Sequence, residues 1–160
     1  MSLPPLQSGE LYAERRRATI LFADIQNSTE LIRDLDPEAA GHLLDAPIQH
    51  MLGAVTRYRG TVSHVLGDGV VAIFGAPNES EDHAVMACLA ARAILDTMET
   101  HHRGAIRVRV GVHSGEVVFR HVQVGRSHSY DSIGAAVHIA ARLEQTAEPG
   151  TACISAATHD

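Results

Sequence analysis

The sequence predicts an α+β sandwich in which helices pack on a mainly antiparallel sheet. Apolar runs of strand length alternate with segments of helical periodicity along the chain. Two pairs of these runs are separated by short segments that contain glycine, 67–69 and 114–115, which are typical of β-hairpins. Strands that alternate with helices and also pair as hairpins favour this class over a doubly wound parallel sheet.

The first half of the chain is expected to form a central strand, two helices and a β-hairpin. Residues 1–16 are polar, contain two prolines and are interpreted as a flexible lead-in. The apolar run 18–23 predicts a buried strand, and Pro47 is expected to kink or split the helix that contains it. Caps, periodicity and turn residues predict the remaining elements, which are helices at 27–35 and 36–59 and strands at 61–66 and 70–74.

The second half of the chain continues the alternation of helices and strands. Small and apolar side chains repeat at helical spacing from residue 80 to 100. A turn is expected at Ser114-Gly115 between two strands, and Glu148-Pro149-Gly150 is expected to end a helix. The predicted elements are a helix at 80–100, strands at 106–112 and 116–122, a helix at 132–146 and a strand at 151–155.

Composition limits the classes of function that the chain can perform. The 160 residues are enough for one domain with a proper core, and a net charge of −6 argues against nucleic-acid binding. All 13 basic residues are arginines, which excludes any mechanism that needs a lysine from this chain. No apolar run is long enough to span a bilayer and no signal peptide is evident, so a cytoplasmic location is expected. The abrupt ends suggest that 17–160 is one domain excised from a longer protein.

Two aspartates stand where predicted strands end. Asp24 follows the apolar run 18–23 and Asp68 lies between two further runs. Each has an ordinary alternative reading, since Asp24 can cap a helix and Asp68-Gly69 is a common hairpin turn. If the two strands are neighbours, both carboxylates reach one edge of the sheet, as two-metal phosphoryl chemistry requires. The backbone N–H groups of residues 25–29 could then receive phosphate oxygens, and Gly67 leaves the backbone beside Asp68 open to a ligand.

Five segments together resemble the class III nucleotidyl cyclase catalytic domain. The resemblance covers about residues 17–156, nearly the whole chain. Its specificity comes from the order and spacing of the segments, because each one is weak alone. They are Ala18-Thr-Ile-Leu-Phe-Ala-Asp-Ile-Gln-Asn-Ser-Thr29, Gly60-Thr-Val-Ser-His-Val-Leu-Gly-Asp-Gly-Val-Val-Ala-Ile-Phe-Gly-Ala-Pro77, Glu81-Asp-His83, Arg109-Val-Gly-Val-His-Ser-Gly-Glu116 and, in two parts, Ser129-Tyr-Asp-Ser-Ile-Gly134 with Ala140-Ala-Arg-Leu-Glu144.

The resemblance implies a ferredoxin-like sandwich that works as a head-to-tail homodimer with two active sites at the interface. Asp24 and Asp68, with the Ile25 carbonyl, match the ligands of two Mg²⁺ or Mn²⁺ ions. Arg142 matches the arginine that stabilises charge on the α-phosphate, a task suited to a permanently charged group with several donors. Gln26, Asn27, Ser28, Thr29 and Gly67 are the remaining candidates for contact with the nucleotide. Many members of this family use a lysine from a later segment that is not in this sequence.

Three further positions match the residues that bind the base and the ribose. Asp131 matches the residue that accepts a hydrogen bond from the adenine amino group. His64 stands at the position of the second base-binding residue, which is usually a lysine. His138 stands where an asparagine usually orients the ribose, one helical turn before Arg142. Adenine suits the carboxylate Asp131, although rotation of Asp131 toward guanine N1–H leaves GTP open.

The leading hypothesis from the sequence is an adenylyl cyclase that converts ATP to 3′,5′-cyclic AMP and pyrophosphate in intracellular signalling. A guanylyl cyclase that uses GTP differs only in the choice of base. The alternative from another class is a degenerate, non-catalytic nucleotide-binding or dimerisation module that regulates attached domains. His64 and His138 favour that alternative, whereas Asp24, Asp68 and Arg142 count against it.

Overall fold

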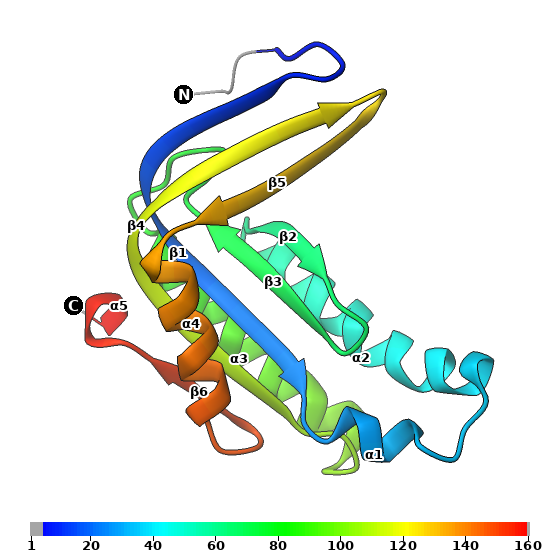
Figure 1. Cartoon of the computed structure of the whole chain (residues 1–160). Helices are drawn as coiled ribbons and strands as arrows, with labels where there is room; N and C mark the ends of the chain where they lie inside the picture. Colours follow the sequence, from blue (N-terminus) through cyan, green and yellow to red (C-terminus); the bar gives the residue numbers. More distant parts are fainter. Residues whose placement is uncertain (1–4, 160) are drawn as a thin grey trace.

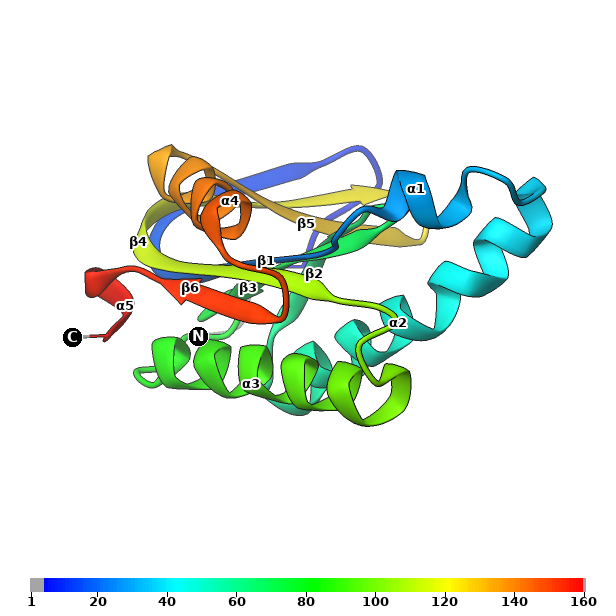
Figure 2. The same ribbon diagram turned by 90° about the horizontal axis from the view of Figure 1, so that it is seen from below.

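A six-stranded sheet covered by helices on both faces forms the core of the protein (Figures 1 and 2). The computed structural model describes residues 5–159. The strand order is β2 (Thr61–Val65), β3 (Gly69–Phe74), β1 (Leu11–Ile25), β4 (Val108–Val124) and β5 (Ser127–Ile133), and β6 (Thr151–Ile154) pairs with β4. Every pairing is antiparallel except β4–β6. The predicted α+β sandwich with a mainly antiparallel sheet is confirmed.

The central strand β1 (Leu11–Ile25) lies between β3 (Gly69–Phe74) and β4 (Val108–Val124). Its side chains alternate between the two faces of the sheet. Leu21, Ala23 and Ile25 pack into the larger core cluster with helices α2 (Pro37–Arg57) and α3 (His83–His102). Ala18 and Ile20 pack on the other face, against helix α4 (Ala135–Thr146). The strand that carries Asp24 is therefore buried on both faces, which fixes its position.

The helices are distributed unevenly over the two faces of the sheet (Figure 2). Helices α2 (Pro37–Arg57) and α3 (His83–His102) cover one face, and α4 (Ala135–Thr146) covers the other. Asp36 caps α2 by accepting a hydrogen bond from Ala39 N at 2.9 Å. The expected split at Pro47 does not occur, because α2 continues through that residue. The short elements are α1 (Ser28–Ile32), β2 (Thr61–Val65), β6 (Thr151–Ile154) and α5 (Ala156–His159).

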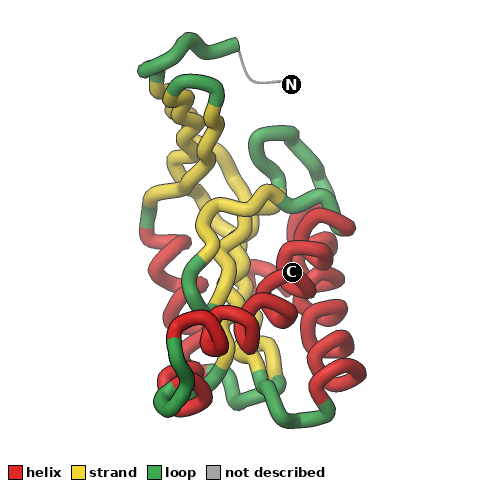
Figure 3. The backbone as a smooth tube through the Cα atoms, turned by 90° about the vertical axis from the view of Figure 1, so that its right-hand side faces the viewer, coloured by secondary structure: helices red, strands yellow, loops and turns green. Residues whose placement is uncertain are grey.

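The expected flexible lead-in is wrong for residues 11–16. These residues form the first part of β1 and pair with residues 117–122 of β4. The run of three arginines concealed the strand, because Arg15 and Arg17 point to solvent while Arg16 is buried. Figure 3 shows this strand-only end of the sheet extending past the helices. Residues 1–4 lie outside the described residues.

The expected hairpin at Ser114-Gly115 is also wrong. Both residues lie inside the single long strand β4, opposite Thr19 and Ala18 of β1. Glycine is used at 115 for close packing, since a Cβ there would lie 3.2 Å from the Cβ of Ala136 in α4. The hairpin partner of β4 is instead β5 (Ser127–Ile133), which the sequence analysis missed. Because β5 carries the start of the predicted helix 132–146, α4 begins later, at Ala135.

Candidate active site

The two predicted metal carboxylates lie on adjacent strands at one end of the sheet. Asp24 is directly opposite Gly69 in the β1–β3 ladder, which places it one position from Asp68. The main chains are joined there by a hydrogen bond of 2.8 Å from Ile25 N to Asp68 O. The convergence of Asp24 and Asp68 that the sequence predicted is thus present in the structure.

Glycine at position 69 is required for this close approach. A Cβ on Gly69 would lie 2.4 Å from the Ala23 carbonyl oxygen and 3.1 Å from the Asp24 Cβ. The Asp68-Gly69 pair therefore does more than turn a hairpin, since it lets β3 pack against the strand end that bears Asp24. Gly67, by contrast, is exposed and has open space around its Cα, so its backbone is accessible from solvent.

The two carboxylates differ in their hydrogen bonds. Asp68 Oδ2 accepts from the Ser28 hydroxyl at 2.8 Å, which orients that carboxylate. Asp24 Oδ1 is buried and accepts no hydrogen bond from an N–H or hydroxyl group of the described residues, so the neighbouring buried acid Glu144 is the group that can donate a proton to Asp24. A buried carboxylate oxygen without a partner is costly unless a cation occupies the site. The Asp24 oxygen therefore fits either a proton shared with Glu144 or a bound divalent cation.

The donor set at this end of the sheet fits Mg²⁺ or Mn²⁺ with substrate phosphate completing the coordination. Asp24 and Asp68 supply hard carboxylate oxygens, which these ions prefer. Within residues 5–159, no group of three or more histidine, cysteine, aspartate or glutamate side chains is arranged to hold a metal alone. Mg²⁺ is commonly bound by one or two carboxylates together with substrate phosphates. The residues present are therefore compatible with ions that arrive with a nucleotide.

Arg109 and Glu144 surround Asp24, and the sequence analysis assigned neither of them a role. Arg109 Nη2 lies 3.6 Å from Asp24 Oδ2 and 3.2 Å from Glu144 Oε1, while its Nη1 donates to the Gln145 carbonyl at 3.1 Å. Glu144 is buried, with 6% of its surface exposed. Burial, a hydrogen bond with Asp24 and the charge of Asp24 raise the pKa of Glu144 to about 8.

A signal for the buried acid was present in the sequence. Ala136, Ala140 and Glu144 follow one another at intervals of four residues, and all three lie on the buried face of α4. The helix also approaches the sheet very closely, since a Cβ on Gly111 of β4 would lie 2.3 Å from Glu144 N. An acid in such a row is buried and needs a partner, which here includes Arg109.

The expected phosphate-binding role of the backbone at 25–29 is only partly compatible with the structure. Ile25 N donates to Asp68 O and Gln26 N donates to Arg107 O, each at 2.8 Å, so these two N–H groups are already used. Asn27 adopts a left-handed conformation with φ of 55° and is the N-cap residue of α1, just after β1 ends at Ile25. Helix α1 has only 5 residues, so its dipole is small. The N–H groups of Asn27, Ser28 and Thr29 remain the candidates.

Arg142 and His138 lie on the outer face of α4. Both are exposed, and neither side chain makes a hydrogen bond or ion pair with residues 5–159. They are one helical turn apart, as the sequence predicted, and they face away from the buried row that contains Glu144. A single chain therefore brings Asp24 and Asp68 together without directing Arg142 at them through any contact.

The predicted base-reading residues come from the two edges of the sheet path. His64 is on β2 and Asp131 is on β5, and these strands contact each other although four pairings separate them. Figure 1 shows β2 running close to β5. Asp131 is held by Arg120, whose Nε donates to Oδ1 at 2.7 Å and whose Nη2 donates to Oδ2 at 2.5 Å. The sequence analysis did not foresee this ion pair.

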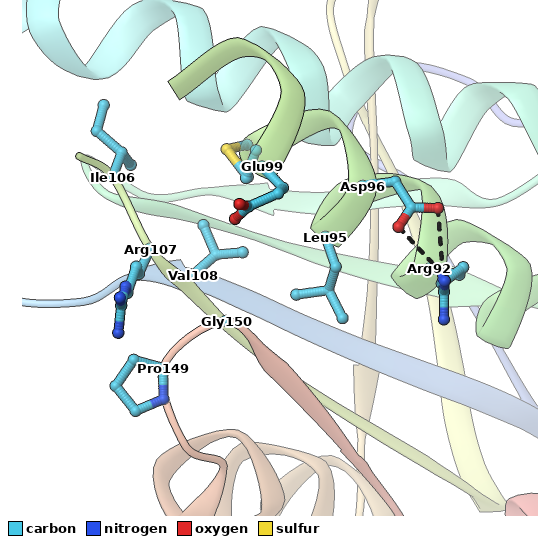
Figure 4. Close-up of a pocket in the computed structure, with 10 residues that line it drawn as sticks. Arg92, Leu95, Asp96, Glu99, Ile106, Arg107, Val108, Pro149 and Gly150 are labelled. Carbon is cyan, nitrogen blue, oxygen red and sulfur yellow. Dashed lines mark hydrogen bonds and ion pairs between the residues drawn. The ribbon is translucent and has the colours of Figure 1, made fainter. Parts of the chain in front are cut away.

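A separate surface cavity of about 470 Å³ lies between α3 and the start of β6 (Figure 4). It is bordered by the Arg92–Asp96 ion pair of α3, by Arg107 and by Pro149. Neither Asp24 nor Asp68 lines it, and its lining carries both arginines and acidic side chains rather than a uniformly basic set. The cavity is therefore not the candidate site.

Comparison with known proteins identifies the family. The sequence model of the family described as "Adenylate and Guanylate cyclase catalytic domain" matches residues 11–160. Two proteins of Mycobacterium tuberculosis described as uncharacterized, Rv1319c and Rv1318c, are 33% and 32% identical over 87% and 96% of this chain. The chain covers 26% and 29% of their lengths, so it spans about a quarter of the curated relatives that it matches.

Solved structures with the same fold include cyclases for both purine nucleotides. The adenylyl cyclase CyaB from P. aeruginosa has a TM-score of 0.84 and 28% identity, covering 92% of this chain and 81% of that chain. The guanylyl cyclase Cya2 has a TM-score of 0.76 and 28% identity, covering 95% of this chain and 79% of that chain. The protein therefore belongs to the adenylate and guanylate cyclase catalytic domain family. No helix within residues 5–159 has the length and apolar character needed to cross a membrane.

Proposed function

We propose that this domain is an adenylyl cyclase that converts ATP to 3′,5′-cyclic AMP and pyrophosphate at the interface of a head-to-tail homodimer. The observation that carries the proposal is the convergence of Asp24 and Asp68 at the ends of two adjacent strands. Two divalent cations, when bound, would stabilise the negative charge on the phosphates during the displacement. Asp24 and Asp68, with the Ile25 carbonyl, are the proposed ligands.

The proposed reaction is an in-line displacement at the α-phosphorus. The 3′-oxygen of the ribose forms a bond to that phosphorus while the bond to the bridging oxygen of the β-phosphate breaks, releasing pyrophosphate. The proton of the ribose 3′-hydroxyl is transferred to Asp24, Asp68 or water. Arg142 donates hydrogen bonds to the α-phosphate oxygens as their charge increases, and His138 orients the ribose by one hydrogen bond.

The exposed face of α4 supports a site shared between two chains. Arg142 and His138 have no partner among residues 5–159, and they lie on the face of α4 opposite to the one that contacts Asp24. Exposed apolar side chains lie beside the outer face of α4 and beside the turn that carries Asp68. They are Ile139 next to His138, and Val65 and Leu66 at the β2–β3 turn. Burial of such residues in a head-to-tail dimer would place Arg142 of one protomer at the carboxylates of its partner.

The base pocket is proposed to lie between β2 and β5. His64 donates to adenine N1 and Asp131 accepts from the adenine amino group. The two strands are already in contact in one chain, so base recognition does not depend on the partner.

ATP is a nucleotide of the cytoplasm, which is the proposed location, and the two free thiols of Cys88 and Cys153 fit a reducing compartment.

Product analysis tests the proposed function directly. The purified domain is incubated with ATP and Mn²⁺, and cyclic AMP and pyrophosphate are measured. Asp24→Asn and Arg142→Ala are each expected to reduce kcat by at least about 100-fold, since each removes a charge that acts in the transition state. Asp96→Asn is the matched control, because Asp96 is an exposed aspartate that pairs with Arg92 on α3, away from the candidate site. Absence of any cyclic nucleotide, also from a longer chain, would contradict the proposal.

A non-catalytic nucleotide-binding module is the second candidate. It is favoured by His64 and His138, which stand where the resemblance leads one to expect lysine and asparagine. This candidate predicts that an ATP analogue binds in a metal-dependent manner that Asp24→Asn weakens, while the wild-type domain forms no product. Binding and turnover measured on the same sample distinguish the two candidates.

A further inference from the structure

We propose that Arg120 is a specificity-determining residue that makes the base pocket prefer ATP to GTP by holding both carboxylate oxygens of Asp131. This inference rests on the proposed function, because it assumes that Asp131 faces the purine. Arg120 itself is not among the residues that the motifs indicated. The preference follows from which hydrogen bonds a held carboxylate can still accept.

The geometry of the pair is bidentate and cross-strand. Arg120 on β4 lies directly opposite Asp131 on β5 in the antiparallel ladder. Arg120 Nε and Nη2 donate to Oδ1 and Oδ2 at 2.7 and 2.5 Å, which is the fork geometry of a strong arginine–carboxylate pair. The side chains are half-buried, with 34% and 26% of their surfaces exposed. Rotation of the Asp131 carboxylate would therefore break two charge-assisted hydrogen bonds.

Adenine and guanine make different demands on a carboxylate. The edge of adenine offers one donor group, the C6 amino group, beside the acceptor N1. The edge of guanine offers two parallel donors, N1–H and the C2 amino group, beside the acceptor O6. A carboxylate that is free to turn can accept from both guanine donors, one with each oxygen, in the same fork geometry that arginine uses.

Arg120 occupies that fork. The two lone pairs of Asp131 that point in parallel are used by Nε and Nη2, so only the outward lone pairs of Oδ1 and Oδ2 remain. These outward lone pairs point in different directions, so the edge of one base can donate a hydrogen bond to just one of them. One acceptor matches the single amino group of adenine, whereas guanine would leave a donor without a partner. A site that cannot pair a polar group of the wrong substrate rejects that substrate.

His64 complements the held carboxylate. The Ser63 hydroxyl and His64 Nδ1 are 2.8 Å apart, and a hydroxyl that donates to Nδ1 leaves the proton on Nε2. An Nε2–H group donates to adenine N1 but opposes the N1–H of guanine. A donor from β2 and one acceptor from β5 together match the adenine edge.

The test compares kcat/KM for ATP and for GTP in the wild-type domain and in Arg120→Gln. Without the two hydrogen bonds from Arg120, Asp131 is free to accept from both guanine donors. The ratio of kcat/KM for ATP to kcat/KM for GTP is therefore expected to fall about tenfold, the value of roughly one hydrogen bond. Arg120→Lys, which keeps the charge but not the fork, is expected to give an intermediate ratio. Arg92→Gln is the matched control, since it removes an arginine–aspartate pair on α3 away from the pocket.

Displacement of a fluorescent ATP analogue by ATP and by GTP, with Ca²⁺ present, provides a second readout that does not depend on turnover. A purely structural role for Arg120 would lower the rates or affinities for both nucleotides equally and leave their ratio unchanged, which overturns the inference. If the wild-type domain forms no cyclic nucleotide, the proposed function fails and the displacement ratio decides the inference alone. If neither nucleotide binds, both proposals are overturned. Thermal unfolding of each variant checks that it is folded.

Discussion

Arg109 and Asp24 occupy directly opposed positions on β4 and β1, and Arg109 Nη2 lies 3.6 Å from Asp24 Oδ2. The same guanidinium contacts the Glu144 side chain and the carbonyl oxygen of Gln145 at the end of α4. One arginine thus connects a proposed metal ligand with the helix that carries Arg142. The position of Asp24 and the position of α4 are therefore coupled within each protomer.

Replacement of Arg109 is expected to destabilise the domain. Arg109→Gln removes the positive charge between Asp24 and buried Glu144, and we expect the free energy of unfolding to fall by about 1–3 kcal/mol. Urea denaturation at neutral pH with a chelator present measures this change. Arg92→Gln, which breaks an exposed pair within α3, is expected to change the same quantity by less than about 0.5 kcal/mol. Equal effects of the two substitutions would contradict the role assigned to Arg109.

Glu144 is expected to make the metal-free domain less stable as pH rises. Its pKa is raised from 4.5 to about 8 in the folded chain, so between these values the folded state binds more protons than the unfolded state. The contribution of Glu144 to stability is therefore most favourable below pH 4.5 and declines until about pH 8. Unfolding free energies measured from pH 5 to 8 in chelator give this slope.

Glu144→Gln is expected to flatten that pH dependence and to be more stable than the wild type at pH 8, because it removes the buried ionisable group. Glu148→Gln, at an exposed position just after α4, is the matched control and is expected to keep the wild-type slope. A wild-type slope in Glu144→Gln would show that another group titrates.

Two glycines provide a paired test of the close approach between β1 and β3. Gly69→Ala places a Cβ 2.4 Å from the Ala23 carbonyl oxygen, so the strands must separate beside Asp24. We expect a loss of about 2 kcal/mol or more in the free energy of unfolding, and weaker Mn²⁺ binding measured by electron paramagnetic resonance. Gly53→Ala in α2 has open space and is expected to stabilise the domain by about 0.5–1 kcal/mol. A neutral Gly69→Ala would show that the contact is not needed.

The strand ends that bear the two carboxylates were predictable because each depends on local signals. An apolar strand that ends in Asp24 and a hairpin that contains Asp68 each mark a strand end. Because α1, α2 and β2 lie between β1 and β3 in the chain, local pattern did not fix the pairing of these strands, which the resemblance to the cyclase domain implied. The buried face of α4 was equally predictable from the spacing of its residues, although the burial of Glu144 on that face was not predicted. Local pattern was sufficient for the strand ends, for the β2–β3 hairpin and for the buried face of one helix.

The course of β4 was not predictable from local signals. Ser114-Gly115 has the composition of a turn, but its small side chains serve contact with α4 and pairing with β1, which are set by residues far away in the chain. Strand β5 is mostly polar and has no fully buried residue, so it lacks the apolar alternation that marks a half-buried strand. The Arg120–Asp131 pair depends on the register of these two strands and was therefore also missed.

Complementation between two inactive variants tests the proposed shared site most directly. Asp24→Asn and Arg142→Ala are produced together with different affinity tags, and cyclic AMP formation is measured for the mixture and for each variant alone. In a homodimer whose sites combine both chains, half of the dimers are mixed and each mixed dimer has one intact site, so about a quarter of the wild-type activity is expected. Activity in the mixture that stays at the level of the separate variants would contradict the account.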